Sequence, residues 1–196
     1  MRALIATTLV LLSLALPRAL QASDDDKNAA VHQEFSGVAM SIGTPGNPTG
    51  AAPVDITITR WSSKDDQHRF LDALSSEGQD AALDRLQDLK SVGTIRINRQ
   101  GLAYDLRYSQ ETRKPDGGRQ IFLMTDRPIS AWEAWAQPRY SDYPFTLITM
   151  NLDKDGNGSG SIILAARITA TEDGRFVQAE NFATRPIQFN NIKEAK

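Results

Sequence analysis

The stretch DKDGNGSGS, residues 153–161, has the residue types and spacing that most closely match a metal site in this chain. A calcium loop takes side-chain oxygens at positions 1, 3 and 5 and a glutamate that supplies two oxygens at position 12. Asp153, Asp155 and Asn157 occupy the first three positions, but Leu164 stands where the glutamate is needed. A polar, glycine-rich hairpin loop explains the stretch without a metal and is the favoured interpretation. Weak calcium binding by Asp153, Asp155 and Asn157 is the alternative.

An aromatic segment, PISAWEAWAQPRYSDYPF at 128–145, interrupts a region that otherwise has the pattern of strands. Trp132 and Trp135 are three positions apart, so they share one face of a short predicted helix that ends at Pro138. Because aromatic side chains bury large areas, the segment is interpreted first as a plug that closes one end of a core.

The same segment has a functional interpretation as a wall of a small-ligand pocket. The candidate ligand-binding residues are Trp132, Trp135, Arg139, Tyr143 and Arg107, with Arg139 or Arg107 meeting an anionic group of the ligand. The plug is favoured over the pocket wall, because the pattern by itself shows no cavity.

Carboxylate catalysis is the third chemical hypothesis. Four acids fall in or near the predicted strands: Asp105, Asp126, Glu133 and Asp142. A facing pair could act as general acid and base. However, Asp105 shares a strand face with Arg107, and Asp126 precedes Arg127, so structural ion pairs are favoured over catalysis.

Other common kinds of catalytic site lack the residues they need. The chain has two histidines and no cysteine, so it has no set of ligands for a zinc site built from these residues. It also has no glycine-rich phosphate loop, dinucleotide fingerprint or serine-nucleophile elbow. No catalytic residue and no cofactor is therefore predicted.

The elements that must position these groups are mainly strands. Val54, Ile56 and Ile58 alternate with polar residues, as a half-buried strand requires. Two amphipathic helices follow, the first capped by Ser63 and ended by Gly78, the second beginning near Asp80. Strands are predicted at 34–42, 54–59, 93–98, 102–110, 119–126, 145–152, 161–171, 175–181 and 186–190. Residues 43–53 are predicted to form a loop, and tight turns are predicted at Asp116-Gly117 and Asp173-Gly174.

Three of the predicted strands, IFLMT, FTLITMNL and IILAARI, are apolar on both faces, so each face must be covered. The helix pair can cover one face, and a sheet that curls on itself can cover the other. The predicted fold is therefore mainly β: a single antiparallel curved sheet or closed barrel of about eight or nine strands. It carries a two-helix insertion after the second strand and a short aromatic helix between later strands.

The beginning of the chain has the pattern of a signal peptide: Arg2, an apolar run over residues 3–16, and a small residue, Ala22, for cleavage. The run is too short to span a bilayer. We expect an exported, soluble, disulfide-free protein, periplasmic or secreted. The expected segments are a signal peptide at 1–22, a flexible arm at 23–33, one β-rich domain at 34–192 and a C-terminal tail at 193–196.

The charge of the expected mature chain is mildly acidic. Removing residues 1–22 removes two of the 22 basic residues and none of the 24 acids, which leaves 20 minus 24, or -4. The basic residues are also spread evenly, so nucleic acid is not an expected partner. The sequence does not define an oligomeric state.

Four strings resemble an uncharacterised family of exported bacterial proteins of about this size. They are WSS, YDLRYSQET, GGRQIFLMTDRPI and DYPFTLITMNLDKDG, and the similarity extends over about residues 54–192. The resemblance implies export and a shared fold and carries no activity. The function expected first is non-catalytic binding of a small apolar or amphipathic ligand. A structural or interaction module with a solid core comes second, and a carboxylate-dependent hydrolase or isomerase comes third.

Overall fold

The structure is a computed structural model, which describes residues 30–42, 49–99, 101–127, 129, 143–182 and 185–195. The predicted signal peptide at 1–22 lies outside the described residues, as does most of the predicted arm. So does most of the predicted aromatic helix, with Trp132, Trp135 and Arg139.

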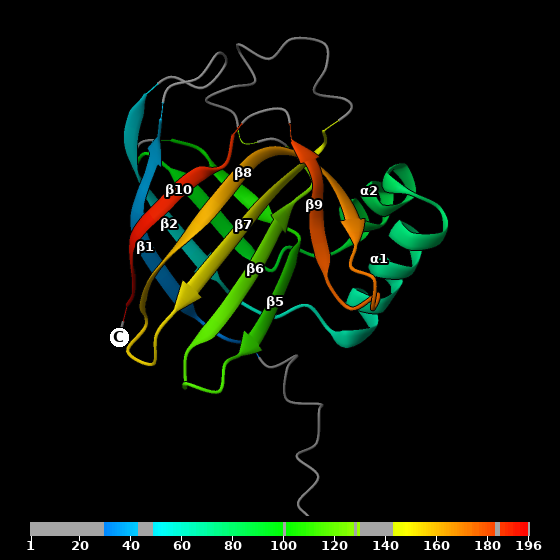
Figure 1. Ribbon diagram of the computed structural model, residues 1–196, viewed down its shortest axis with the longest axis horizontal. Helices are drawn as coiled ribbons and strands as arrows, with labels where there is room; N and C mark the ends of the chain where they lie inside the picture. Colours follow the sequence, from blue (N-terminus) through cyan, green and yellow to red (C-terminus); the bar gives the residue numbers. More distant parts are fainter. Residues whose placement is uncertain are drawn as a thin grey trace, which may run out of the picture.

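The described chain forms one antiparallel sheet with a pair of helices beside it (Figure 1). Its elements are β1 (Gln33–Ser41), β2 (Gly50–Ile58), α1 (Lys64–Ser76), α2 (Gln79–Asp88), β3 (Gly93–Ile97), β4 (Ala103–Leu106), β5 (Tyr108–Arg113), β6 (Arg119–Thr125), β7 (Phe145–Leu152), β8 (Asn157–Ala170), β9 (Val177–Phe182) and β10 (Ile187–Glu194). The strand order is β4-β3-β2-β1-β10-β8-β7-β6-β5, with β9 paired to β8 outside this path. The prediction of a mainly β fold with two helices after the second strand is confirmed.

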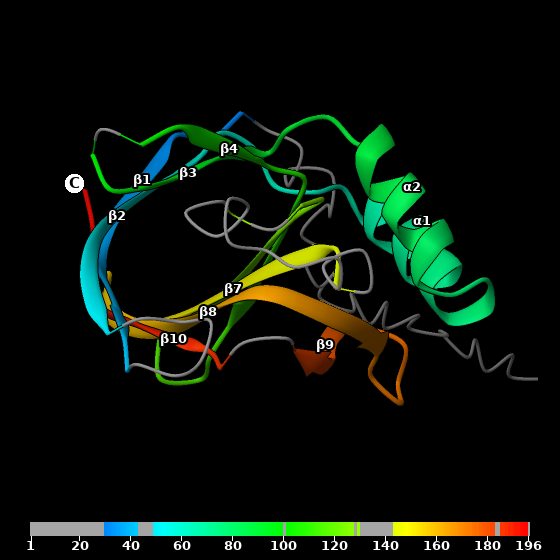
Figure 2. The same ribbon diagram turned by 90° about the horizontal axis from the view of Figure 1, so that it is seen from above.

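The sheet curls into a nearly closed barrel because one stretch of chain contributes to both of its edges. β4 lies at one end of the strand order and β5 at the other, yet only Arg107 separates them in the sequence. The backbone N–H of Arg107 donates to the carbonyl of Met124 on β6 at 2.9 Å, which joins the two edges. Figure 2 shows the strands curving around a common interior, with both helices outside it.

The prediction of one continuous strand over 102–110 is therefore wrong, because the chain changes partner and face at Arg107. Alternate residues of a regular strand face the same side. Here Leu106 packs inside the barrel, whereas Tyr108 packs outside it against the helices. A regular strand could not place these two fully buried side chains in separate cores.

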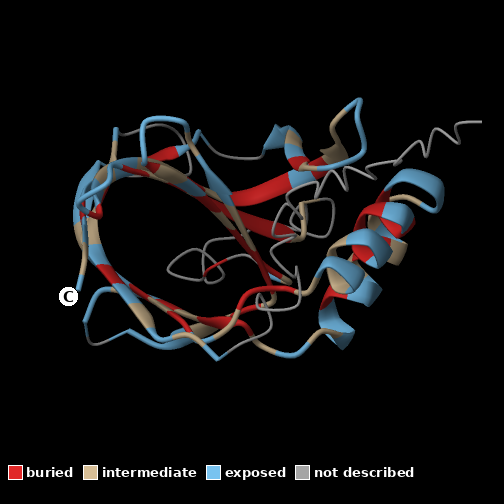
Figure 3. Cartoon of the chain, turned by 90° about the horizontal axis from the view of Figure 1, so that it is seen from below, coloured by how far each residue is buried: buried red, intermediate tan, exposed pale blue. Residues whose placement is uncertain are grey.

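The barrel interior is one hydrophobic core. Its largest members are Trp61, Phe35 and Phe189, and aliphatic side chains from β2, β3, β6, β7 and β8 belong to the same core. Figure 3 shows buried residues distributed along the strands around the barrel and on both helices.

A second core lies between the outer face of the sheet and the two helices. Phe70, Leu71 and Leu74 of α1 and Ala82 and Leu86 of α2 are buried there with Tyr108, Met124, Phe145, Leu147 and Ala166 of the sheet. The rings of Phe70 and Tyr108 are 5.4 Å apart. The interior and this outer core together confirm that β6, β7 and β8 are covered on both faces, as their apolar sequences predicted.

Local capping sets the beginning of α1. The Ser63 side chain accepts a hydrogen bond from the backbone N–H of Asp66 at 3.0 Å, as the predicted capping box requires. At the other end of the pair, the Gln79 side chain accepts from the backbone N–H of Ile168 at 2.9 Å. The helix pair is thus tied to β8 as well as packed against it.

Three strand boundaries differ most from the prediction, by four residues each. β2 begins at Gly50, so the second half of the predicted loop at 43–53 is strand, held by its ladder with β1. β8 begins at Asn157 rather than at Ser161. β10 extends to Glu194 and pairs with β1 through Phe35, so part of the predicted tail is strand.

An arginine network stabilises the end of the barrel where β6 begins and β10 ends. The Arg119 guanidinium forms ion pairs with Glu194 at 2.6 Å and Glu111 at 3.5 Å. It also donates a hydrogen bond to the Gln33 side chain at 3.2 Å and lies 5.6 Å from the centre of the Phe35 ring. The side chains of Arg119 and Glu111 are only 17% and 16% exposed, so these charges are largely desolvated and depend on one another.

Three hairpins use the same turn chemistry. Gly117, Gly156 and Gly174 each follow an aspartate, have φ of 84°, 80° and 65°, and donate the backbone N–H to the carbonyl three residues earlier. This arrangement is a turn closed by a glycine in the left-handed region, rather than the predicted two-residue turn with two positive φ angles.

We expect Gly174→Ala to lower the free energy of unfolding by about 1 kcal/mol, since only the left-handed backbone opposes a Cβ there. Nothing lies within 4 Å of that Cβ. Gly156→Ala should cost clearly more, because its Cβ would lie 2.8 Å from the Glu194 carboxylate that pairs with Arg119. Urea denaturation of both variants measures the difference, and equal losses would show that Glu194 moves aside at no cost.

Candidate functional site

A pocket opens at the barrel end where β1 ends and β2 begins, opposite the Arg119 network. Its volume is about 500 Å³. Its described lining consists of Ala39, Ser41, Thr49, Gly50, Ala51, Ala52, Ile97, Asn98, Gly101, Leu102, Tyr104, Ile129, Leu164 and Ile187. This volume lies within the range of about 300–1,000 Å³ that is typical of small-molecule sites.

The side chains that β1 and β2 contribute to the pocket are small. Ala39 lies opposite Ala52 in the β1–β2 ladder, and Ser41 lies opposite Gly50. The corresponding pair at the other end of β1 is Phe35 with Ile56, both fully buried. Among the described residues, large side chains therefore fill one end of the barrel, and the other end is left hollow.

The polarity of the lining changes along the pocket. Ile129, Leu164 and Ile187 are buried apolar residues, whereas Ser41, Thr49 and Asn98 lie at the outer ends of strands. None of the described lining residues carries a formal charge. The Oγ of Ser41 is shielded from solvent and makes no hydrogen bond.

The predicted ligand-binding residues fall in different places. Tyr143 is half-buried just before β7, and neither it nor Arg107 belongs to the described lining of the pocket. Trp132, Trp135 and Arg139 lie outside the described residues.

Ala39 and the small residues at 50–52 were not among the predicted site residues. Residues 50–52 fall in the predicted loop at 43–53, and Ala39, in the predicted strand at 34–42, is not unusual by itself. A useful clue was nevertheless present. Gly50, Ala51 and Ala52 are small and immediately precede the alternating residues of a strand. Small side chains at the end of a strand do not fill the barrel interior beside them.

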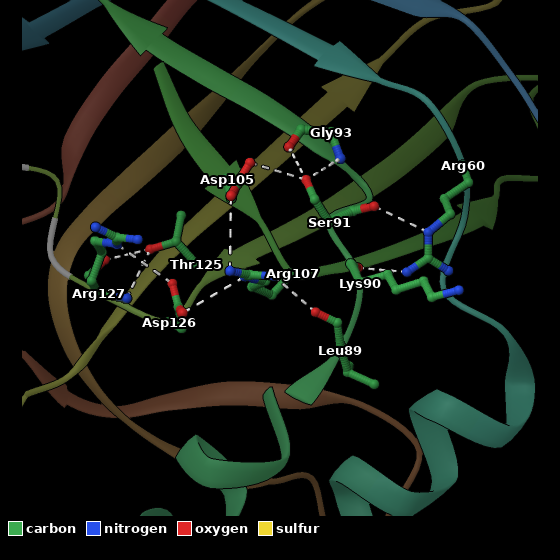
Figure 4. Close-up of polar contacts among 10 residues, drawn as sticks. All are labelled: Arg60, Leu89, Lys90, Ser91, Gly93, Asp105, Arg107, Thr125, Asp126 and Arg127. Atoms are coloured by element: carbon green, nitrogen blue, oxygen red, sulfur yellow. Dashed lines mark hydrogen bonds and ion pairs between the residues drawn. The ribbon is translucent and has the colours of Figure 1, made fainter. Parts of the chain in front are cut away.

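Arg107 lies in a polar cluster at the point where β4 and β5 meet (Figure 4). Its guanidinium donates to the carbonyl of Leu89 at 2.9 Å and lies 3.8 Å from Asp105 and 3.7 Å from Asp126. Asp126 is also 3.7 Å from the Arg127 guanidinium. These contacts confirm the predicted ion pairs and join the end of α2 to β4 and β6.

Neighbouring residues extend this cluster along the connection between α2 and β3. The Ser91 hydroxyl donates to the Gly93 carbonyl at 2.8 Å and contacts Asp105 at 3.2 Å. Arg60 donates to the carbonyls of Ser91 and Lys90. The arrangement satisfies backbone carbonyls that the irregular connection leaves without ladder partners, so its first role is structural.

The stretch at residues 153–161 is the β7–β8 hairpin, as the favoured interpretation predicted. The Asp153 carboxylate accepts from the backbone N–H groups of Asp155 at 2.8 Å and Asn157 at 2.9 Å. These bonds, that of Asn157 first, lower the pKa of Asp153. Among the described residues, no three or more His, Asp or Glu side chains lie where they could hold a metal ion together.

Comparisons with family models, curated proteins and solved structures give no match to this chain. None of the described helices has the length and apolar character needed to cross a membrane.

We expect Arg107→Met to lower the free energy of unfolding by about 2–3 kcal/mol, because it leaves the Asp126 carboxylate buried without its main partner. The Asp126 side chain is 9% exposed. Arg113→Met on β5 is the matched control, since its side chain is 88% exposed and should change stability by less than about 0.5 kcal/mol. Chemical denaturation gives both values, and equal small effects would refute a structural role for Arg107.

We expect calcium to leave the hairpin unchanged, because the Asp153 carboxylate already binds backbone N–H groups. Asp153→Ala should lower Tm by the same amount with millimolar calcium as with chelator. A calcium-dependent rise in Tm that Asp153→Ala abolishes would instead establish the metal site.

Proposed function

We propose that this protein is an exported, non-catalytic binding domain that holds a small apolar or amphipathic ligand at the hollow end of its barrel. The observation that carries the proposal is the pocket of about 500 Å³ among apolar side chains of the barrel wall. Export is proposed from the sequence of residues 1–22, with the mature chain beginning near Ser23.

The exposure of Leu102 supports the proposal. Leu102 lines the pocket and is 77% exposed, although a large apolar side chain is more stable out of water. A ligand in the pocket would cover it. The buried side chains of Leu164 and Ile187 would form a dry wall for the apolar part of such a ligand.

The carboxylate hypothesis receives less support from the contacts of Asp105 and Asp126. Both acids face the same arginine, Arg107, and Arg127 is a further partner of Asp126. The two acids therefore make the contacts of structural ion pairs and do not face each other as a pair in the described pocket.

The proposal is tested by filling the pocket. Ala52→Phe places a ring among the lining residues, and Ala179→Phe makes the same change at a half-buried position of an outer groove beside β9. We expect the neutral fluorophore N-phenyl-1-naphthylamine to bind the mature protein with enhanced emission. Ala52→Phe should weaken binding at least tenfold, whereas Ala179→Phe should leave it unchanged. Circular dichroism confirms that both variants fold.

Native mass spectrometry of protein purified from the producing cell without denaturation provides the second readout. A mature mass that begins near Ser23 supports export, and an added mass lost on denaturation supports a bound ligand. Uncleaved chain would contradict export. Failure of the fluorophore to bind, or equal losses in the two phenylalanine variants, would contradict a ligand site in the barrel.

A further inference from the structure

The pocket is arranged so that its chemical character changes from the interior of the barrel to its outer end. Ala39 and Ser41 are two residues apart on β1, so both face the interior, with Ser41 nearer the end of the strand. Their ladder partners, Ala52 and Gly50, occupy the same two levels on β2. The deeper pair, Ala39 and Ala52, is apolar, whereas Ser41 places a hydroxyl nearer the outer end of the pocket.

The absence of charge from the described lining limits what can enter. Moving an ionised carboxylate or ammonium group out of water is strongly unfavourable unless a partner of opposite charge receives it. Among the described residues that line the pocket there is no such partner. Arg107, one of the two arginines predicted to meet an anionic group, is engaged by Asp105 and Asp126 instead, and Arg139, the other, lies outside the described residues.

Ser41 provides an unused hydrogen-bonding group at the outer level. Its Oγ is buried and has no hydrogen-bond partner. Such a group costs free energy unless something pairs with it, so native proteins seldom leave one unsatisfied. Ser41 is also a lining residue of the pocket, and rotation about its Cα–Cβ bond among the staggered rotamers can redirect the hydroxyl toward an occupant.

The size of the pocket limits the ligand further. At about 30 Å³ for each water-sized group, 500 Å³ has room for on the order of 15 non-hydrogen atoms. A chain of about a dozen carbons with a small polar end fits within this volume.

We infer that the ligand is a neutral amphipathic molecule, a long-chain alcohol or a comparable lipid with an uncharged oxygen group. That oxygen hydrogen-bonds to Ser41, and the hydrocarbon part packs on Leu164 and Ile187. This inference rests on the proposed function and specifies the ligand class of the same pocket.

Three probes of equal chain length test the charge preference: 1-dodecanol, dodecanoate and dodecylammonium. Each competes with N-phenyl-1-naphthylamine for the full mature protein near neutral pH, below the concentration at which it aggregates. We expect 1-dodecanol to bind at least tenfold more tightly than either charged probe.

Ser41→Ala tests the hydrogen bond. We expect it to weaken 1-dodecanol binding by about two- to tenfold, the range for one hydrogen bond, with 1-dodecanol affinity measured by direct titration as well as by competition. Ser161→Ala, the same change on the outer face of β8, is the matched control and should affect neither probe.

The outcomes separate the inference from the proposed function. If the fluorophore does not bind, the ligand site itself fails. If the fluorophore binds and Ala52→Phe blocks it, but dodecanoate or dodecylammonium binds as tightly as 1-dodecanol, the site stands and the neutral ligand class is overturned. If Ser41→Ala weakens 1-dodecanol no more than Ser161→Ala does, the assignment of the oxygen to Ser41 is overturned.

Discussion

The barrel depends on the change of face at Arg107, where β4 passes into β5. This single residue lets one stretch of chain pair with β3 on one side and with β6 on the other. It also directs Leu106 into the interior and Tyr108 toward the helices. The guanidinium of Arg107 stabilises the irregular backbone by binding the Leu89 carbonyl and two carboxylates. The curvature of the nearly closed barrel and the separation of its two hydrophobic cores therefore both depend on the chain at Arg107.

The asymmetry between the two ends of the barrel follows from the side chains that each end contains. Phe35, Phe189 and the Arg119 network fill and cover one end. In the part of the chain that the structure describes, small residues on β1 and β2 leave the other end hollow. The same strands form both ends, so the packing at the filled end stabilises strands that also line the pocket. A barrel of this kind can hold a site without every layer of its interior being packed.

Much of the fold could be predicted from local patterns in the sequence. Alternation identified β2, capping by Ser63 identified α1, and the double-sided apolar strands β6, β7 and β8 required two cores. The break at Arg107 could not be predicted, because residues 102–110 alternate well enough for one strand and only the pairing partners differ. The hollow end was missed for a similar reason. Turn-forming residues at 43–53 hid the strand that begins at Gly50, and its position opposite Ser41 is a property of the ladder.

The candidate site also has some features that adjacent residues predict and others that depend on residues far apart in the sequence. The hairpin at Asp153 was recognised because its Asp-Gly turn is a local feature. Ile187 and Ala39 meet at the pocket only after strands from opposite ends of the chain have paired. The sequence does not reveal that these two residues lie close together, because isoleucine and alanine are common residue types.

The pairing of β1 with β10 has a consequence for the order in which the chain can fold. Phe35 and Glu194 are ladder partners although they lie 159 positions apart, 194 minus 35. Contacts of such high sequence separation are slow to form, because a long loop must close before they contribute. The meander from β5 to β8 has only local connections and can assemble early. During synthesis, the edge of β1 that pairs with β10 must stay open until β10 has emerged, so this pairing forms after the intervening strands are available.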